Sequence, residues 1–161
     1  MAKKDSADAT LVERRREMGG LAFFKHMLEG QMPQAPMTQL LQMKLVEVEE
    51  GRVVFEATPS HEHYNGMGVV HGGFAATLLD SALGCAINSM APPGRIYTTL
   101  ELKINYTRAL TEEVGPVRCE AKVVHVGTRT ATAEGRIVDA DGKLYAHGST
   151  TCISIDPPRR T

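Results

Sequence analysis

The sequence lacks several features that would assign it to a specialised class of protein. It has 161 residues, no Trp and only three Cys, namely Cys85, Cys119 and Cys152, which form no CxxC pair. A chain of this length buries about 70% of its unfolded surface on folding, so a single domain needs no disulfide staples. The odd number and wide spacing of the cysteines are atypical of a zinc site and predict buried thiols in a reducing compartment.

An excess of one charge and a long apolar run are also missing. The 18 Lys and Arg nearly balance the 19 Asp and Glu, whereas nucleic-acid-binding domains usually carry a basic face. The most apolar stretch, residues 66–91, is interrupted by His71, Asp80 and Asn88 and does not resemble a membrane span. Residues 1–17 contain charges but no apolar segment typical of a secretory signal. We therefore expect a cytoplasmic protein that binds neither nucleic acid nor membranes.

The N-terminal part of the chain has the pattern of a helix followed by a hairpin. A capping box at Thr10 and Glu13 is expected to open the helix. The Gly19-Gly20 pair within this stretch could divide it into two shorter helices, because glycine disfavours a helix interior. Two strand-like runs, at residues 43–49 and 52–58, flank a Glu-Gly turn signal and predict a β-hairpin.

The rest of the chain predicts one long helix and four more strands. Residues 72–88 have apolar side chains at helical spacing, and almost every other position in them is small. Strand-like runs follow at residues 97–108, 117–125, 128–139 and 144–155. This order predicts an α+β fold, in which a sheet of about six strands and one long helix leave a face or the edges uncovered. We therefore expect self-association, beginning with dimers that pair edge strands.

The most unusual segment is a polar, glycine-rich loop, residues 61–73, that leads directly into the apolar helix. If the helix begins at Gly72, its first free N–H groups and the positive end of its dipole point at whatever lies beside His71. Such an arrangement could stabilise an oxyanion. The alternative interpretation is that Gly72 and Gly73 only permit a tight turn.

Asp80 lies in the middle of the apolar helix, where a carboxylate is costly. Such a group either finds partners or has its pKa raised, which is how carboxylates become general bases near neutral pH. The alternative is a position on the solvent edge of the helix. On one continuous helix, His71 and Asp80 differ by about 13.5 Å along the axis and about 180° around it. A site that uses both must therefore combine two subunits across a two-fold axis.

The first strand after the long helix offers a hydroxyl group. Strand alternation predicts that Thr99 and Glu101 lie on one side and that Leu100 and Leu102 lie on the other, core-facing side. Thr99 could hold a water near the carboxylate, or it could be an ordinary β-branched strand residue.

Two other groups have an ordinary interpretation beside the functional one. Arg129, close to Gly127, could contact a phosphate or could be a solvated side chain at a strand end. His61 and His63 are two residues apart with no third ligand in evidence, so no metal site is expected there.

Taken in order, these residues resemble the motif of a known family. Asn65, then His71-Gly72-Gly73, Asp80 and the strand at residues 99–108 are similar in order and spacing to the hotdog-fold thioesterases. The resemblance is specifically to the phenylacetate-degradation (PaaI-type) acyl-CoA thioesterase family.

The resemblance implies a hotdog fold, in which a curved antiparallel sheet of about six strands wraps a long central helix; here an extra N-terminal helix precedes it. It divides the chain into an N-terminal helical extension at residues 1–40, a thioesterase domain at residues 41–156 and a tail at residues 157–161. Members of this family form dimers whose sheets join edge to edge, so we expect a homodimer and, beyond it, a homotetramer.

The resemblance also implies a reaction, the hydrolysis of an aryl or medium-chain acyl-CoA to the free acid and CoA. Asp80 would act as the general base or the nucleophile, and the Gly72 N–H would polarise the thioester carbonyl. His71 and Asn65 would position the thioester or the attacking water, and Thr99 would support that water.

Contacts with the CoA part of the substrate are implied for five positions, namely Gly73, Arg108, Gly127, Thr128 and Arg129. Thr128 departs from the family pattern, because relatives often carry a basic residue there. No metal is expected, and no cofactor other than the CoA of the substrate itself. The acyl pocket is expected in the dimer interface, lined by the long helix, Met67 and Phe74 and covered by residues 23–27.

Two alternatives to a hydrolase stay open at this point. One is a hotdog enoyl-CoA hydratase or dehydratase, which resembles a different motif, so the spacing of His71 and Asp80 argues against it. The other is a non-catalytic acyl-CoA-binding protein that has lost the base, and the intact Asn65, His71 and Asp80 argue against that.

Overall fold

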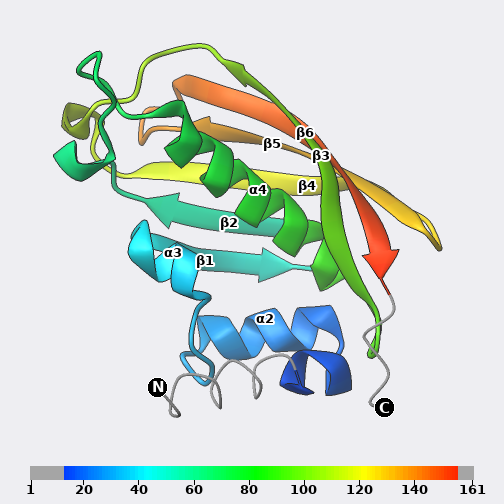
Figure 1. Cartoon of the computed structure of the whole chain (residues 1–161). Helices are drawn as coiled ribbons and strands as arrows, with labels where there is room; N and C mark the ends of the chain where they lie inside the picture. The colour runs from blue at the N-terminus through cyan, green and yellow to red at the C-terminus, as the bar shows by residue number, and fades with distance from the viewer. Residues whose placement is uncertain (1–12, 156–161) are drawn as a thin grey trace.

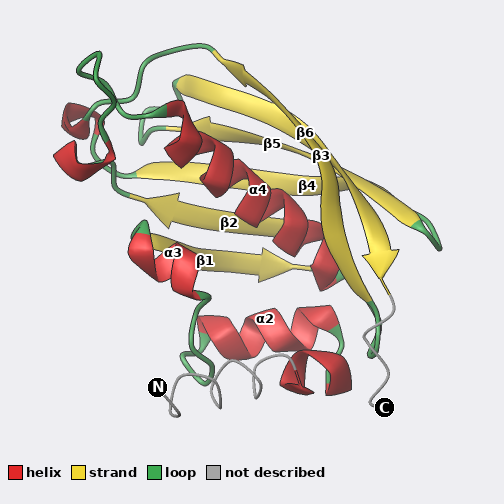
Figure 2. Cartoon of the chain, viewed as in Figure 1, coloured by secondary structure: helices red, strands yellow, loops and turns green. Residues whose placement is uncertain are grey.

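A curved antiparallel sheet wraps one long helix, and shorter helices precede both (Figures 1 and 2). The computed structural model describes residues 13–155. Thr10 of the predicted capping box and the predicted tail at residues 157–161 lie outside the described residues. The α+β hotdog architecture expected from the sequence is confirmed. In the described part of the chain, no helix combines the length and hydropathy that a bilayer crossing requires.

The sheet has six strands in the order β1-β2-β4-β5-β6-β3, and all neighbouring strands are antiparallel. The predicted hairpin is confirmed, with Gly51 at its turn in the left-handed region (φ 74°). Every predicted strand lies within two residues of an observed one. The strands are β1 (Met43–Glu49), β2 (Arg52–Ala57), β3 (Ile96–Tyr106), β4 (Val117–Val126), β5 (Thr130–Val138) and β6 (Leu144–Ile155).

The central helix α4 (Gly72–Ser89) crosses the concave face of the sheet and contacts all six strands. Its length matches the apolar periodicity of the sequence. The side that faces the sheet is buried, whereas the opposite side consists of small, half-buried residues such as Ser81 and Cys85. The buried side carries the residues with apolar spacing, namely Phe74, Ala75, Leu78, Leu79, Ala82, Leu83, Ala86 and Ile87.

The N-terminal stretch forms several short helices instead of one. Residues 13–17 are helical, the helix is interrupted at Met18 and Gly19, and α2 (Gly20–Leu28) follows. The predicted split is therefore confirmed. Packing also requires a glycine at position 20, because a Cβ there would lie 1.7 Å from the carbonyl oxygen of Asn88 at the end of α4. The five-residue helix α3 (Pro36–Leu40), which the sequence analysis did not predict, leads into β1.

A β-bulge in β3 corrects one expectation about this strand. Thr99 pairs with Cys152 of β6 and Glu101 pairs with Thr151, so Leu100 is an extra residue between them. Leu100 is 60% exposed instead of facing the core. The prediction that Thr99 and Glu101 share a face is therefore wrong, because the inserted residue shifts the alternation of side chains by one position.

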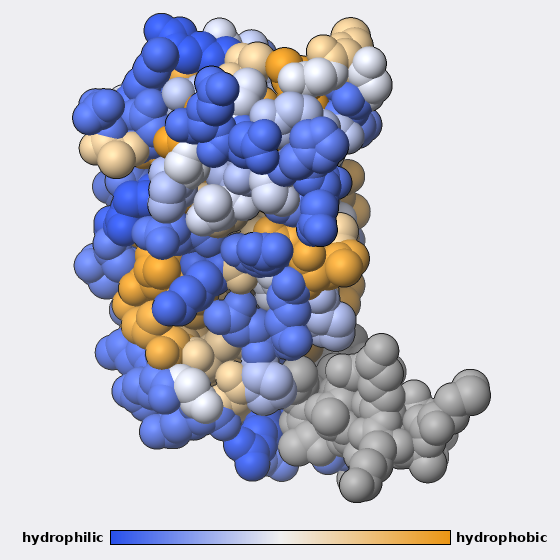
Figure 3. Space-filling view, turned by 90° about the vertical axis from the view of Figure 1, so that its left-hand side faces the viewer, coloured by the Kyte–Doolittle hydropathy of each residue, from blue (hydrophilic) through white to orange (hydrophobic). Residues whose placement is uncertain are grey.

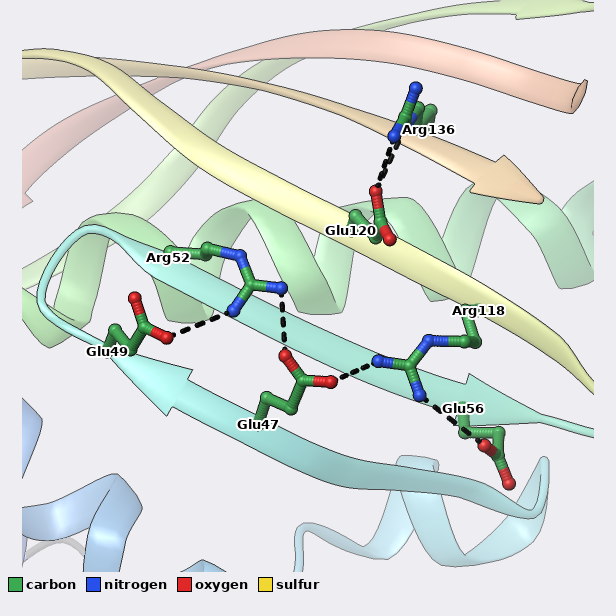
Figure 4. A network of polar contacts seen from close by, with 7 residues as sticks. All are labelled: Glu47, Glu49, Arg52, Glu56, Arg118, Glu120 and Arg136. Carbon is green, nitrogen blue, oxygen red and sulfur yellow. Dashed lines mark hydrogen bonds and ion pairs between the residues drawn. The ribbon is translucent and has the colours of Figure 1, made fainter. Parts of the chain in front are cut away.

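The outer face of the sheet, on the side away from α4, carries a network of ion pairs (Figure 4). Glu47 of β1 lies at its centre and pairs with Arg52 of β2, at 2.8 Å, and with Arg118 of β4. Glu49 and Glu56 extend the network at 3.3 Å and 3.9 Å from the same two arginines. The hydrogen bonds from both guanidinium groups lower the pKa of Glu47 below its usual value.

We expect Glu47→Gln to lower the free energy of unfolding at pH 7 by about 0.5–1 kcal/mol, because the pairs are partly exposed and solvent screens them. Since the folded-state pKa of Glu47 is depressed, this contribution is present above the unfolded pKa and is lost as the pH falls through the folded pKa. Urea unfolding of both proteins at neutral and strongly acidic pH measures the difference. Glu49→Gln, which removes only one 3.3 Å pair, is the control. A difference that does not change with pH would contradict the assignment.

Candidate active site

The glycine-rich loop is held in one conformation by its own hydrogen bonds. The Asn65 side-chain oxygen accepts the Met67 N–H at 2.8 Å, and the Asn65 N–H donates to the Val69 carbonyl at 2.8 Å. At the end of the loop, the His71 N–H donates to the carbonyl of His63 at 2.7 Å. These bonds bring Asn65 and His71 to the start of α4, and no acceptor in the described part of the chain bonds to the Asn65 amide NH2, which is a potential donor.

His71 is the N-cap residue of α4. Its Nδ1 accepts the Gly73 N–H at 2.8 Å, so the neutral imidazole carries its proton on Nε2. The Nε2–H is then a donor on an exposed side chain. Because the Gly73 N–H donates to His71, this bond uses the backbone donor of Gly73. A direct contact of Gly73 with the substrate remains a prediction.

Gly72, the first residue of α4, supplies a free backbone donor. Among the described residues, no acceptor bonds to its N–H, which lies at the positive end of the helix dipole. The Tyr106 hydroxyl donates to the Gly72 carbonyl at 3.1 Å, and a Cβ on Gly72 would lie only 3.2 Å from the tyrosine ring. A glycine therefore allows this close packing. Tyr106 lies in the motif strand at residues 99–108, but nothing in the motif indicated this role.

Four of the predicted site residues line one cavity, which we call the His71 cavity. It has a volume of about 420 Å³, and Tyr106 forms part of its wall. The predicted residues that it brings together are Asn65, His71, Gly72 and Arg108. The cavity thus combines uncharged N–H donors with one cation, which suits a ligand with a carbonyl oxygen and a negatively charged end.

Asp80 and Thr99 form a second group near the middle of α4. Asp80 is half-buried, and its Oδ1 accepts the Thr99 hydroxyl at 2.9 Å. The sequence predicts that this carboxylate either finds a partner or has a raised pKa, and Thr99 is such a partner. Thr99 reaches it from β3 immediately before the bulge at Leu100, and bulges commonly orient side chains next to active sites.

The two groups do not meet within one chain. Because α4 is unbroken from Gly72 to Ser89, Asp80 lies about 13.5 Å further along the axis than His71. No hydrogen bond or ion pair among the described residues links the two side chains. We call these two groups half-sites, because the sequence predicts that they form one site across a dimer; that union stays a prediction.

The turn between β4 and β5 contains the other predicted CoA contacts, Gly127, Thr128 and Arg129. Two main-chain acceptors anchor it: Gly127 accepts the Tyr97 hydroxyl at 2.9 Å, and Arg129 accepts the Ser154 N–H at 2.7 Å. The side chains of Thr128 and Arg129 are exposed. Since Tyr97 lies two residues before Thr99 on β3, the turn belongs to the half-site of Asp80 rather than to the His71 cavity.

The histidine pair in the loop makes contacts of another kind. His63 Nδ1 accepts the Ser60 N–H at 3.0 Å, and its ring packs on Phe74 with centroids 4.5 Å apart. The ring of His61 lies 5.1 Å from that of Tyr64. Within residues 13–155, no three side chains of the types that bind metals are grouped together.

Comparisons with known proteins show the family of this chain. The model of a family described as "Thioesterase superfamily" matches residues 67–146. A relative from Archaeoglobus fulgidus with the name "Putative esterase" is 32% identical over 73% of this chain and 74% of its own. The chain belongs to the thioesterase superfamily. Human acyl-coenzyme A thioesterase 13 is 30% identical to it, over 66% of this chain and 76% of the human protein.

Solved structures place this thioesterase among hotdog proteins. A conserved protein of Pseudomonas aeruginosa is 33% identical with a TM-score of 0.71, covering 76% of this chain and 95% of its own. The PaaI protein of Escherichia coli, at 22% identity and a TM-score of 0.73, shares the fold over 86% of this chain and 96% of its own. The protein is thus a thioester hydrolase of the hotdog fold, as the motif predicted, and the comparisons favour this function over the hydratase.

Proposed function

We propose that this thioesterase hydrolyses an acyl-CoA to the free acid and CoA, in a site shared between two subunits. The observation that carries the proposal is the pair of groups on α4, a free N–H at Gly72 and a carboxylate at Asp80 that Thr99 holds. Thioester hydrolysis needs both an oxyanion donor and a base or nucleophile. Acyl-CoA is the proposed substrate because a relative carries the name acyl-coenzyme A thioesterase.

In the proposed reaction, the Asp80 carboxylate takes a proton from a water whose oxygen attacks the thioester carbonyl carbon. The resulting oxyanion accepts the Gly72 N–H, and one such donor lowers a barrier by about 3–4 kcal/mol where this has been measured. The C–S bond then breaks, and the CoA thiolate leaves and takes up a proton. If Asp80 is instead the nucleophile, its oxygen attacks the carbonyl carbon, the C–S bond breaks with loss of the CoA thiolate, and water cleaves the resulting anhydride to the free acid and the Asp80 carboxylate.

The other residues of the two half-sites receive binding roles. The His71 Nε2–H and the Asn65 amide group donate to the thioester or the water. Arg108, in the same cavity, and Arg129, in the exposed turn, supply positive charge for the CoA phosphates, and Gly127 and Thr128 contact the pantetheine nearby. We propose no metal and no cofactor beyond the CoA of the substrate. The three free thiols fit the cytoplasmic location that we expect.

The dimer that unites the half-sites is proposed to form through β3. This strand is 11 residues long and forms one edge of the sheet, and within residues 13–155 it pairs with β6 alone. Leu100 and Tyr106, on this strand, are 60% and 56% exposed. An exposed edge of this length is prone to pair with a second copy. The other edge, β1, packs against α2 and α3.

The face of the molecule on the left-hand side of Figure 1 is a weaker candidate for the dimer interface than β3. The end of the molecule seen in Figure 3 is mainly hydrophilic, with separate hydrophobic areas. Obligate interfaces usually form one larger apolar patch. We therefore propose β3 for the dimer, and a further association of two dimers into a homotetramer.

The experiment that tests the function is free-thiol release from a panel of aromatic and straight-chain acyl-CoAs by the purified protein without added metal. Hydrolysis of at least one member, with one acyl group preferred, is expected. Binding of the CoA esters without any release of thiol would contradict the proposal and favour a non-catalytic acyl-CoA-binding protein.

Thr99 is proposed to orient the Asp80 carboxylate. Thr99→Val keeps the shape of the side chain and removes the hydroxyl, so we expect kcat to fall about tenfold with little change in KM. Thr99→Ser, which can restore the hydrogen bond, is expected to recover most of this loss. Steady-state kinetics and the pH profile of kcat measure both. Equal losses in the two variants would mean that Thr99 contributes packing and not orientation.

A further inference from the structure

A second cavity, the α2–α4 cavity, lies between α4 and the N-terminal helices. Its volume is about 350 Å³. Residues of α2, β2 and α4 form half of its wall, namely Phe23, Phe24, Met27, Phe55, Ser81 and Cys85. Small-molecule pockets start at about this size, which is too small for a whole CoA ester but sufficient for an acyl group.

The wall of the α2–α4 cavity is mainly apolar and well packed. The rings of Phe23 and Phe24 meet edge to face, with centroids 5.5 Å apart and an interplanar angle of 78°. Both rings are buried. Such a wall contributes to binding mainly through the apolar surface that a ligand removes from water.

Arg15 bounds the cavity near the C-terminal end of α4. Its side chain is 7% exposed, and it donates to the carbonyl oxygens of Met18, Asn88 and Arg95 and to the Asn88 side chain, each at 3.3 Å. The guanidinium group also lies 5.9 Å from the centroid of the Phe23 ring. Arg15 thus fixes the N-terminal segment against α4 and forms a polar end to an otherwise apolar space.

The other end of the α2–α4 cavity is bounded by the stretch of α4 that also carries Asp80. Ser81, in the wall, directly follows Asp80 on α4. Cys85 lies one helical turn beyond Ser81 on the same wall, and its pKa is raised to about 12 by burial and, in addition, by the negative charge of Asp80. A thioester at Asp80 can therefore extend its acyl chain along α4 into this space.

We propose that the α2–α4 cavity binds the acyl group and selects a straight chain of medium length. The proposal rests on the proposed function and names the substrate class of the same site. Three residues of the segment 23–27, which the sequence predicts as a cover, line this cavity, namely Phe23, Phe24 and Met27. Met67 does not line it but belongs to the His71 cavity, and Phe74 lies in the core.

The dimensions of the cavity set the expected chain length. Ser81 lies at one end of the cavity, and Arg15, which contacts Asn88, lies at the other. Between Ser81 and Asn88, α4 rises by about 10 Å. An extended chain with C–C bonds of about 1.5 Å covers this distance with about eight carbons. The volume of about 350 Å³ is roughly twice that of the ~150 Å³ cavity that accepts benzene. A single ring would therefore leave part of the cavity unfilled, whereas an acyl chain of about eight to ten carbons fills it.

The test compares acyl-CoAs from acetyl to palmitoyl, together with phenylacetyl-CoA. For the wild-type protein, we expect kcat/KM to rise about fourfold for each added methylene up to about eight to ten carbons and then to fall. Cys85→Leu, which fills the cavity, is expected to lower the ratio of kcat/KM for octanoyl-CoA to that for acetyl-CoA about tenfold. Met27→Ala, which enlarges it, is expected to move the optimum to longer chains.

The two variants predict opposite shifts, so a loss of folding cannot produce the expected result. Leu28→Ala is the matched control, because Leu28 follows Met27 on α2 but is 42% exposed. Its chain-length profile is expected to equal that of the wild-type protein. Unchanged profiles in both cavity variants would overturn the proposal and leave the thioesterase function intact.

Binding of octanoate by calorimetry separates the two proposals if no acyl-CoA is hydrolysed. Octanoate binding that Cys85→Leu weakens about tenfold would support the cavity as an acyl site although the proposed function fails. Octanoate that binds the wild-type protein and Cys85→Leu equally, or binds neither, would overturn the cavity proposal.

Discussion

Replacement of Asp80 by Asn is expected to lower kcat about a thousandfold and to change the affinity for acyl-CoA no more than about twofold. Asparagine has the same shape and can still accept the Thr99 hydroxyl, whose oxygen lies 2.9 Å from Oδ1. It cannot take a proton from water or attack a carbonyl at neutral pH. The chemical step is therefore lost, while the fold and the binding surfaces are retained.

Thiol-release kinetics with the preferred acyl-CoA, and calorimetric binding of the same ester to the inactive variant, measure the two quantities. Asp141→Asn is the matched control, because this substitution makes the same change of charge in the exposed turn between β5 and β6. Its kcat is expected to equal that of the wild-type protein. Hydrolysis by Asp80→Asn at the wild-type rate would show that Asp80 is neither the base nor the nucleophile.

A heterodimer of His71→Ala and Asp80→Asn chains is expected to recover about half of the wild-type activity, although each homodimer is nearly inactive. The two residues belong to separate half-sites of one chain, since α4 runs unbroken between them. If each site takes Asp80 from one chain and His71 from the partner subunit, the heterodimer contains one intact site and one doubly damaged site. Co-expression with two affinity tags isolates the heterodimer for thiol-release measurements.

The control for this experiment uses two residues of the same half-site. Asn65 and His71 both line the His71 cavity, so a heterodimer of Asn65→Ala and His71→Ala chains has no intact site and is expected to recover no activity. Recovery in this pair as well, or in neither pair, would contradict a site shared between subunits.

Much of the fold follows from local patterns in the sequence. Alternating residues on strands and 3.6-residue periodicity in α4 depend on which side chains face the core, and this preference acts at every position. The bulge at Leu100 was not predictable in this way. It depends on how β3 pairs with β6, which lies about 50 residues further along the chain.

In the candidate site, too, some features were predictable from the sequence and others were not. Asn65, His71, Gly72 and Asp80 were predicted from a motif, because their order and spacing around one helix start are visible in the chain. The packing of Tyr106 on Gly72 depends on the approach of an edge strand to the helix start. Contacts of this kind come from the curvature of the sheet and leave no periodic signal.

By itself, the sequence determined that this protein has one long small-residue helix, six strands and a thioesterase motif, because these depend on residue type and spacing along the chain. The tertiary structure decided how the motif is divided: Thr99 holds Asp80, and Arg108 lies in one cavity with His71. It also decided that the N-terminal helices enclose an apolar space beside Ser81. Long-range packing brings these residues together, and the residue types alone do not specify such contacts.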